Sequence, residues 1–174
     1  MTVGTGKCFA DVGIAKLLTV VLSLAFTIVG CESSDHRKLV EDFPKYETSL
    51  NKARELILAL HASVQLTGYI VEENGHDSIV LNKHDVVELE QAYTIKTGPA
   101  FSDVLRLKET LRKLTADNAH VSDQSDLTIV MRGGGVLGAD IGYAYLTSPP
   151  LTPIAGKTKY FPIPSDVHWY VFVH

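Results

Sequence analysis

Cysteine and clustered positive charge are both scarce in this chain of 174 residues. Its two cysteines are Cys8 and Cys31, and 20 acidic residues outnumber 16 lysines and arginines, for a formal net charge of −4. Non-specific binding of nucleic acid needs clustered positive charge, and electrostatic attraction to anionic lipid needs a polybasic tract. The sequence therefore argues against a nucleic-acid partner and offers no tract of that kind.

Motifs of the common enzyme classes are also missing. The chain has no Gly-x-Ser-x-Gly nucleophile elbow and no pair of histidines at the helical spacing of a zinc protease. Three aspartates near His120 lack the glycine-centred loop of an EF-hand. The seven histidines are scattered: His36, His61, His76, His84, His120, His168 and His174. We therefore predict no metal, no cofactor and no catalytic residue.

An apolar segment, Leu17–Gly30, stands close to the N-terminus. A helix of its 14 residues covers only about 21 Å, whereas the core of a bilayer is roughly 30 Å thick. Lys7 and Lys16 supply a positive flank, so the segment is typical of the hydrophobic region of an export signal. Two alternatives are a buried core helix that ends in a capping glycine and an uncleaved membrane anchor.

The segment ends in Ile28-Val29-Gly30-Cys31, which resembles the lipobox of bacterial lipoproteins. The resemblance implies that residues 1–30 are a signal peptide that is removed. Cys31 then becomes the first residue, thioether-linked to diacylglycerol and acylated on its amino group, as in palmitate-bearing lipoproteins. Several acyl chains give firm membrane attachment where a single chain is marginal.

The same resemblance has three further implications. Glu32 replaces the aspartate that marks inner-membrane retention, so we expect attachment to the outer membrane, facing the periplasm. Removal of Cys8 and lipidation of Cys31 leave no free thiol and no disulfide, so the core alone must stabilise the domain. We expect residues 31–43 to form a lipidated tether and residues 44–174 to form a single globular domain.

Two helices are predicted from apolar periodicity. Tyr46, Leu50, Ala53, Ile57, Leu60 and Val64 form one stripe, in a helix predicted to begin at Pro44, where a proline in the first turn costs no hydrogen bond. Val104, Leu107, Leu111 and Leu114 form the second stripe, within a helix from Ser102, the expected N-cap, to Thr115. The other face of this second helix is basic, with Arg106, Lys108, Arg112 and Lys113. This face could bind an acidic partner or anionic head groups. The favoured interpretation is a solvated face on which the basic residues pair locally with Glu109.

Strands account for most of the remaining chain. Residues 66–81 predict a hairpin around Asn74-Gly75, the preferred centre of a tight turn. Asn82 is a candidate cap for a short helix through Tyr93, with a strand as the alternative because Val86-Val87 is β-branched. Residues 127–131 and 136–146 predict a second hairpin, and residues 159–161 and 168–173 predict the last strands. The sum is an α+β domain with two main helices on a largely antiparallel sheet.

Two regions are candidates for a binding surface. The first is the loop Arg132, Gly133, Gly134 and Gly135, although a flexible hairpin loop is favoured because a strand rather than a phosphate-binding helix follows it. The second is the aromatic strand with His168, Trp169 and Tyr170. Alternation puts Trp169, Val171 and Val173 on one face of that strand and His168, Tyr170 and Phe172 on the other, and core packing is the favoured role.

These observations favour a lipid-anchored envelope protein that works by binding. An inhibitor of the immunity type, an assembly factor and an accessory subunit all fit, and an envelope protein is the expected partner. The alternative is a small envelope hydrolase acting on peptidoglycan, glycan or lipid, which would require a cleft that gathers His120 or His168 with two carboxylates. The oligomeric state stays open.

Overall fold

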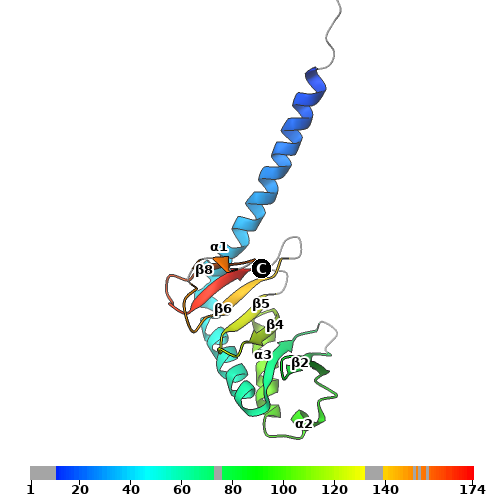
Figure 1. Ribbon diagram of the computed structural model, residues 1–174, viewed down its shortest axis with the longest axis vertical. Coiled ribbons are helices and arrows are strands. Elements are labelled where there is room, and N and C mark those ends of the chain that lie inside the picture. The colour runs from blue at the N-terminus through cyan, green and yellow to red at the C-terminus, as the bar shows by residue number, and fades with distance from the viewer. Residues whose placement is uncertain (1–10, 73–75, 132–138, 151, 153, 156) are drawn as a thin grey trace, which may run out of the picture. The chain divides into compact units, whose positions relative to one another are not determined.

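The computed structural model describes residues 11–72, 76–131, 139–150, 152, 154–155 and 157–174 of the chain (Figure 1). The chain divides into two compact units, Met1–Ser34 and Asp35–His174. In the first unit residues 11–34 are helical. The described part of the second unit combines two main helices with a nine-stranded sheet. The predicted α+β class, in one domain, is confirmed.

Helix α1 (Asp11–Val64) contains the helix predicted from Pro44 to Val64. The predicted stripe is buried at Leu50, Ala53, Ile57 and Leu60. The predicted start is wrong, because α1 continues through Pro44, where a proline removes one helical hydrogen bond. Phe43, fully buried in the core, offsets part of this cost.

All neighbouring strands of the sheet run antiparallel, in the order β3-β2-β1-β4-β5-β6-β9-β8-β7. Among the described strands, two neighbouring pairs, β1 with β4 and β6 with β9, join strands that are not consecutive in the chain. The strands are β1 (Leu66–Ile70), β2 (Ser78–Leu81), β3 (Asp85–Glu88), β4 (Ala116–Val121), β5 (Leu127–Met131), β6 (Ile141–Tyr145), β7 (Ile154–Ala155), β8 (Thr158–Pro162) and β9 (Trp169–Val173).

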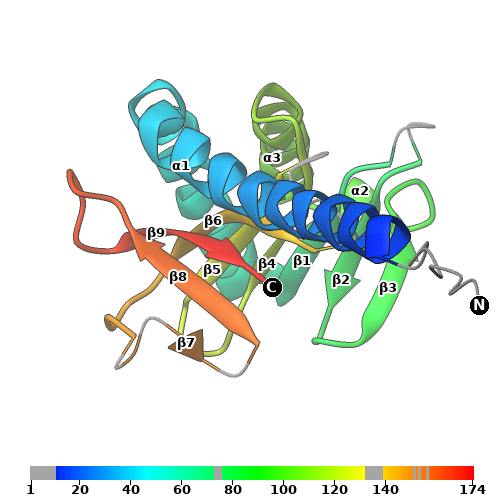
Figure 2. The same cartoon turned by 90° about the horizontal axis from the view of Figure 1, so that it is seen from above.

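Helix α3 (Phe101–Lys113) and residues 35–64 of α1 lie on the same face of the sheet (Figure 2). The predicted stripe of α3 is fully buried at Val104, Leu107, Leu111 and Leu114. Ser102 is not the N-cap, because Ala100 occupies that position without a side-chain cap. The helix therefore owes its position to packing rather than to capping. A single turn, α2 (Tyr93–Lys96), precedes it.

The two predicted hairpins are confirmed by strand pairing, since β1 pairs with β2 and β5 with β6, each antiparallel. The two predicted last strands are β8 and β9, which also pair antiparallel. The turn residues 73–75 and 132–138 lie outside the described part of the chain. Strand β9 has the predicted alternation, since Trp169, Val171 and Val173 belong to the main core. Tyr170 and Phe172 belong to a second, smaller cluster.

The segment after Asn82 is a strand, so the helical interpretation is wrong and the strand alternative is correct. Asn82 and Lys83 have positive φ angles of 48° and 72°, which reverse the chain in a tight turn. The β-branched pair Val86-Val87 then returns beside β2.

Strand β4 was not predicted, although it lies inside the sheet between β1 and β5. Its sequence, Ala-Asp-Asn-Ala-His-Val, is rich in small and polar residues of low strand propensity. Ala116, Ala119 and Val121 are buried against the helices, while His120 is exposed. Tertiary pairing therefore decides the conformation of this segment.

Candidate functional site

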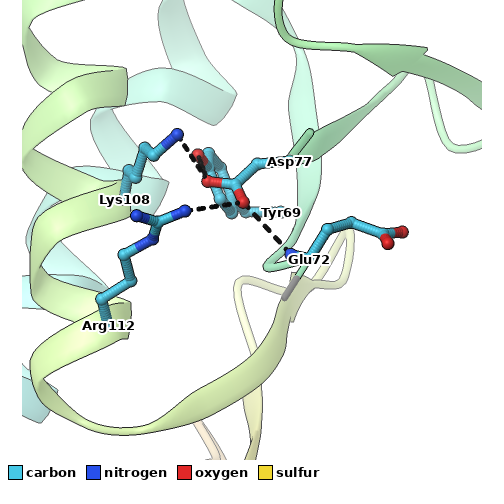
Figure 3. A network of polar contacts seen from close by, with 5 residues as sticks. All are labelled: Tyr69, Glu72, Asp77, Lys108 and Arg112. Atoms are coloured by element: carbon cyan, nitrogen blue, oxygen red, sulfur yellow. Dashed lines mark hydrogen bonds and ion pairs between the residues drawn. The ribbon is translucent and has the colours of Figure 1, made fainter. Parts of the chain in front are cut away.

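Asp77 is the centre of a charged cluster that connects α3 with the β1–β2 segment (Figure 3). Its side chain is 0 % exposed. Oδ2 accepts a hydrogen bond from the Tyr69 hydroxyl at 2.8 Å and lies 3.0 Å from Lys108 Nζ. Oδ1 accepts one from Arg112 Nη2 at 3.2 Å and one from the Glu72 backbone N–H at 3.1 Å. We call these five residues the Asp77 cluster.

The cluster fixes the protonation of its two buried acids. Burial alone would raise the pKa of Asp77, but hydrogen bonds from Lys108, Tyr69 and the Glu72 backbone outweigh it and lower that pKa. Burial, together with the hydrogen bond to Asp77, raises the pKa of the Tyr69 hydroxyl far above its ordinary value. At neutral pH Asp77 is therefore ionised and Tyr69 is protonated.

These directions determine what the Asp77 cluster can do chemically. A general acid or base works best with a pKa near the working pH. The pKa values of Asp77 and Tyr69 both move away from neutrality. The Asp77 cluster therefore has a structural role, which is to hold α3 next to the β1–β2 segment.

The prediction that the basic face of α3 pairs locally is correct for two of its four basic residues. Arg106 and Lys113 pair with acidic residues of the same helix, in agreement with local pairing. Lys108 and Arg112 instead reach across to Asp77. The sequence shows the Asp and the two cations, but they are more than thirty positions apart, and no spacing rule connects them.

A second polar arrangement lies between α1 and the end of β6. The Arg54 guanidinium carbon lies 3.8 Å from the centroid of the Tyr145 ring. Tyr145 also stacks with the His168 ring, with centroids 5.2 Å apart and planes at 26°. We call these three residues the Arg54 stack. Arg54 is not part of the apolar stripe predicted for this helix, yet its Nε is buried.

The Arg54 stack has no counter-ion in the part of the chain that the structure describes. The buried Nε has no hydrogen-bond partner, and Arg54 makes no ion pair among the residues that the structure describes. The neighbouring acid in sequence, Glu55, pairs with Lys52 at 3.5 Å. Arg54 is thus a half-buried cation that contacts an aromatic ring and pairs with no carboxylate of the described residues.

The three predicted residues of the aromatic strand have different positions. Trp169 is fully buried and donates its Nε1–H to Asn51 Oδ1 at 3.0 Å, which makes it a core residue that connects β9 to α1. Tyr170 is buried in the second cluster. His168 is half-buried, and its Nδ1 lies 3.1 Å from the Leu146 carbonyl oxygen.

The other predicted site residues are not described. Arg132, Gly133, Gly134 and Gly135 lie outside the described residues, and the side chain of Cys31 is likewise not described. Among the helices in the described part of the chain, none has an apolar stretch long enough to cross a membrane.

The described histidines do not converge. His61 Nδ1 lies 3.2 Å from the Leu66 carbonyl oxygen, and His174 Nδ1 lies 2.7 Å from Thr158 Oγ1. His36 stacks on a ring of β8. Within the described residues, no group of three or more His, Cys, Asp or Glu side chains is placed to hold a metal ion.

Comparisons of the chain with family models, with curated proteins and with solved structures found no match. The function must therefore be argued from the residues and their contacts.

Proposed function

We propose that this protein is a lipid-anchored binding module of the bacterial cell envelope. The observation that carries the proposal is the sequence Ile28-Val29-Gly30-Cys31 at the end of a short apolar segment. In this proposal Cys31 carries the acyl chains and the unit Asp35–His174 faces the periplasm, from the outer membrane. Its partner is another envelope protein.

Binding is favoured over catalysis by the use that the domain makes of its ionisable groups. Asp77, Lys108 and Arg112 are committed to one another. His168, named in the hydrolase alternative, is committed to the Leu146 carbonyl and the Tyr145 ring. Groups held in this way stabilise a surface that a partner can recognise.

The anchor is tested by incorporation of radiolabelled palmitate into the full chain, expressed in a bacterium that processes lipoproteins. Cys31→Ser is expected to abolish the label and to move the protein from the membrane fraction to the soluble fraction. Cys8→Ser is the matched control and is expected to keep both the label and the membrane association. A label that persists in Cys31→Ser would remove the basis of the proposal.

The binding role is tested by affinity capture from detergent-solubilised envelope with the intact protein. We expect one envelope protein to be recovered in stoichiometric amount. The recovered protein is then purified and titrated against the intact protein, and a one-to-one complex is expected. No complex, together with turnover of peptidoglycan, glycan or lipid by the intact protein, would favour the hydrolase instead.

A further inference from the structure

The Arg54 stack has the properties of an incomplete ion-pair site. A buried polar atom without a hydrogen bond costs about 1–3 kcal/mol, and such atoms are few in native proteins. Arg54 carries one at Nε, and its positive charge has no ion-pair partner among the described residues. An anion from a second molecule, bound at the accessible part of this half-buried side chain, would supply the counter-ion that the described residues do not.

The surroundings of Arg54 are rigid. Tyr145 contacts Arg54, stacks on His168 and meets Trp169 edge-on, with ring centroids 5.4 Å apart in the last contact. Trp169 is in turn bonded to Asn51, one helical turn before Arg54. A guanidinium held flat on a fixed ring loses little entropy when it forms a pair of hydrogen bonds.

The turn before His168 is fixed by hydrogen bonds and exposes an apolar side chain. Val167, next to His168 in the chain, is 74 % exposed, and its carbonyl accepts a hydrogen bond from the Tyr170 hydroxyl at 3.3 Å. Asp166 Oδ1 accepts hydrogen bonds from the His168 and Trp169 backbone N–H groups, which fixes the same turn. Arginine and tyrosine, the two side chains in contact here, are enriched at the centres of protein interfaces, which favours a protein as the ligand.

We propose that Arg54, stacked on Tyr145, receives a carboxylate from an acidic side chain of the protein partner. The planar guanidinium matches the two oxygens of a carboxylate. This inference rests on the proposed binding function. It adds the residue that anchors the partner and the chemistry that the partner must present.

The direct test follows the Nε–Hε signals of the arginines by NMR, in the full lipidated chain in detergent micelles. Sodium acetate is the probe, and sodium chloride at equal ionic strength is the blank. We expect acetate to shift the Arg54 signal in a saturable way, at a concentration about tenfold lower than for Arg106. Arg106 is the internal control because it is exposed and paired with Asp103. An Arg54 signal no more sensitive to acetate than that of Arg106 overturns the inference.

A second arm, with inorganic phosphate, separates the two oxyanions. If phosphate shifts Arg54 and acetate does not, the assignment to a carboxylate is wrong. Tyr145→Leu, which removes the ring under the guanidinium, is expected to abolish the selective response to acetate. Tyr145→Phe keeps the ring and is expected to keep the response, so a general loss of folding is distinguished from loss of the stack.

The partner arm separates this inference from the proposed function. Arg54→Gln is expected to weaken one-to-one binding of the purified partner by at least about tenfold, while Arg106→Gln, the matched arginine variant, leaves it unchanged. Equal binding by the wild type and Arg54→Gln overturns the inference and leaves the binding function standing. If no partner binds even the wild type, the proposed function fails, and the acetate response still decides whether Arg54 is a carboxylate site.

Discussion

The Asp77 cluster and the Arg54 stack are two ways of placing charge away from water. At Asp77 a fully buried anion has two cations, a hydroxyl and a backbone N–H as partners. At Arg54 a half-buried cation has a ring and no described anion. The described residues complete the first site, whereas they supply no counter-ion to the second.

The difference separates stability from recognition. Removing one member of a completed buried ion pair leaves the others uncompensated, which is strongly destabilising. Removing the charge of Arg54, which has no described ion-pair partner, leaves no such group uncompensated. Substitution should therefore cost much more stability at Asp77 than at Arg54, and the following predictions test that contrast from the largest effect to the smallest.

The largest effect is expected from Asp77→Ala, which leaves Tyr69, Lys108 and Arg112 without their acceptor. Lys108 and Arg112 are 24 % and 46 % exposed, so water compensates part of the loss. We expect the free energy of unfolding, measured by urea titration, to fall by about 2–4 kcal/mol. The control Asp85→Ala, on exposed β3, should change it by less than about 0.5 kcal/mol. A loss at Asp77 no larger than the control would show that the cluster does not stabilise the fold.

The pH dependence of stability follows from the lowered pKa of Asp77. A folded-state pKa below the unfolded value of about 3.9 means that the ionised form stabilises the fold. This contribution is complete above the unfolded pKa and is lost as the pH falls through the folded pKa. We expect the stability difference between the wild type and Asp77→Asn to be constant from pH 7 to about pH 5 and to shrink below about pH 4. A difference that stays constant in acid would contradict the assignment of the charge to Asp77.

Removing a tyrosine hydroxyl should cost more stability when its hydrogen bond goes to a carboxylate than when it goes to a backbone carbonyl. Tyr69→Phe deletes a hydrogen bond to a carboxylate, for which we expect a loss of about 1.5–3 kcal/mol. Tyr143→Phe deletes the bond of the Tyr143 hydroxyl to the Leu39 carbonyl, 2.8 Å long, for which about 0.5–1.5 kcal/mol is expected. Both rings are fully buried, so the comparison isolates the acceptor. Equal losses would mean that the charge of Asp77 adds nothing to the bond from Tyr69.

The smallest effect is expected at Arg54. Arg54→Met keeps the apolar stem on the Tyr145 ring, loses a cation–π contact of about 0.5–1 kcal/mol and removes the unpartnered Nε. We expect the free energy of unfolding to stay within about 1 kcal/mol of the wild type. A loss as large as that of Asp77→Ala would mean that Arg54 is a structural residue like those of the cluster, and the contrast would fail.

The two main helices and the two hairpins could be predicted because each has a local pattern of apolar residues in the sequence. The leucine stripe of α3 and the alternation of β9 follow from side-chain periodicity. Strand β4 has no such signature, since Asn118 and His120 interrupt its apolar residues. Its conformation depends on β1 and β5 beside it, and these contacts cannot be read from the segment itself.

The sites were less predictable than the fold. Asp77 contacts Lys108 and Arg112 because the fold places α3 next to the β1–β2 segment. Arg54 likewise contacts Tyr145, which lies far from it in the sequence. Proximity of this kind follows from tertiary packing, so composition gives no indication of it. His168 was a candidate from the aromatic strand, and it lies in the Arg54 stack.

The order of strands in the sheet has a consequence for how quickly the domain folds. Three pieces, β1 to β3, β4 to β6 and β7 to β9, pair only consecutive strands, and only the β1–β4 and β6–β9 contacts join one piece to another. Pairing of consecutive strands closes short loops, whereas the two joining contacts close longer ones. We expect the three pieces to form early and the two joining contacts to set the folding rate.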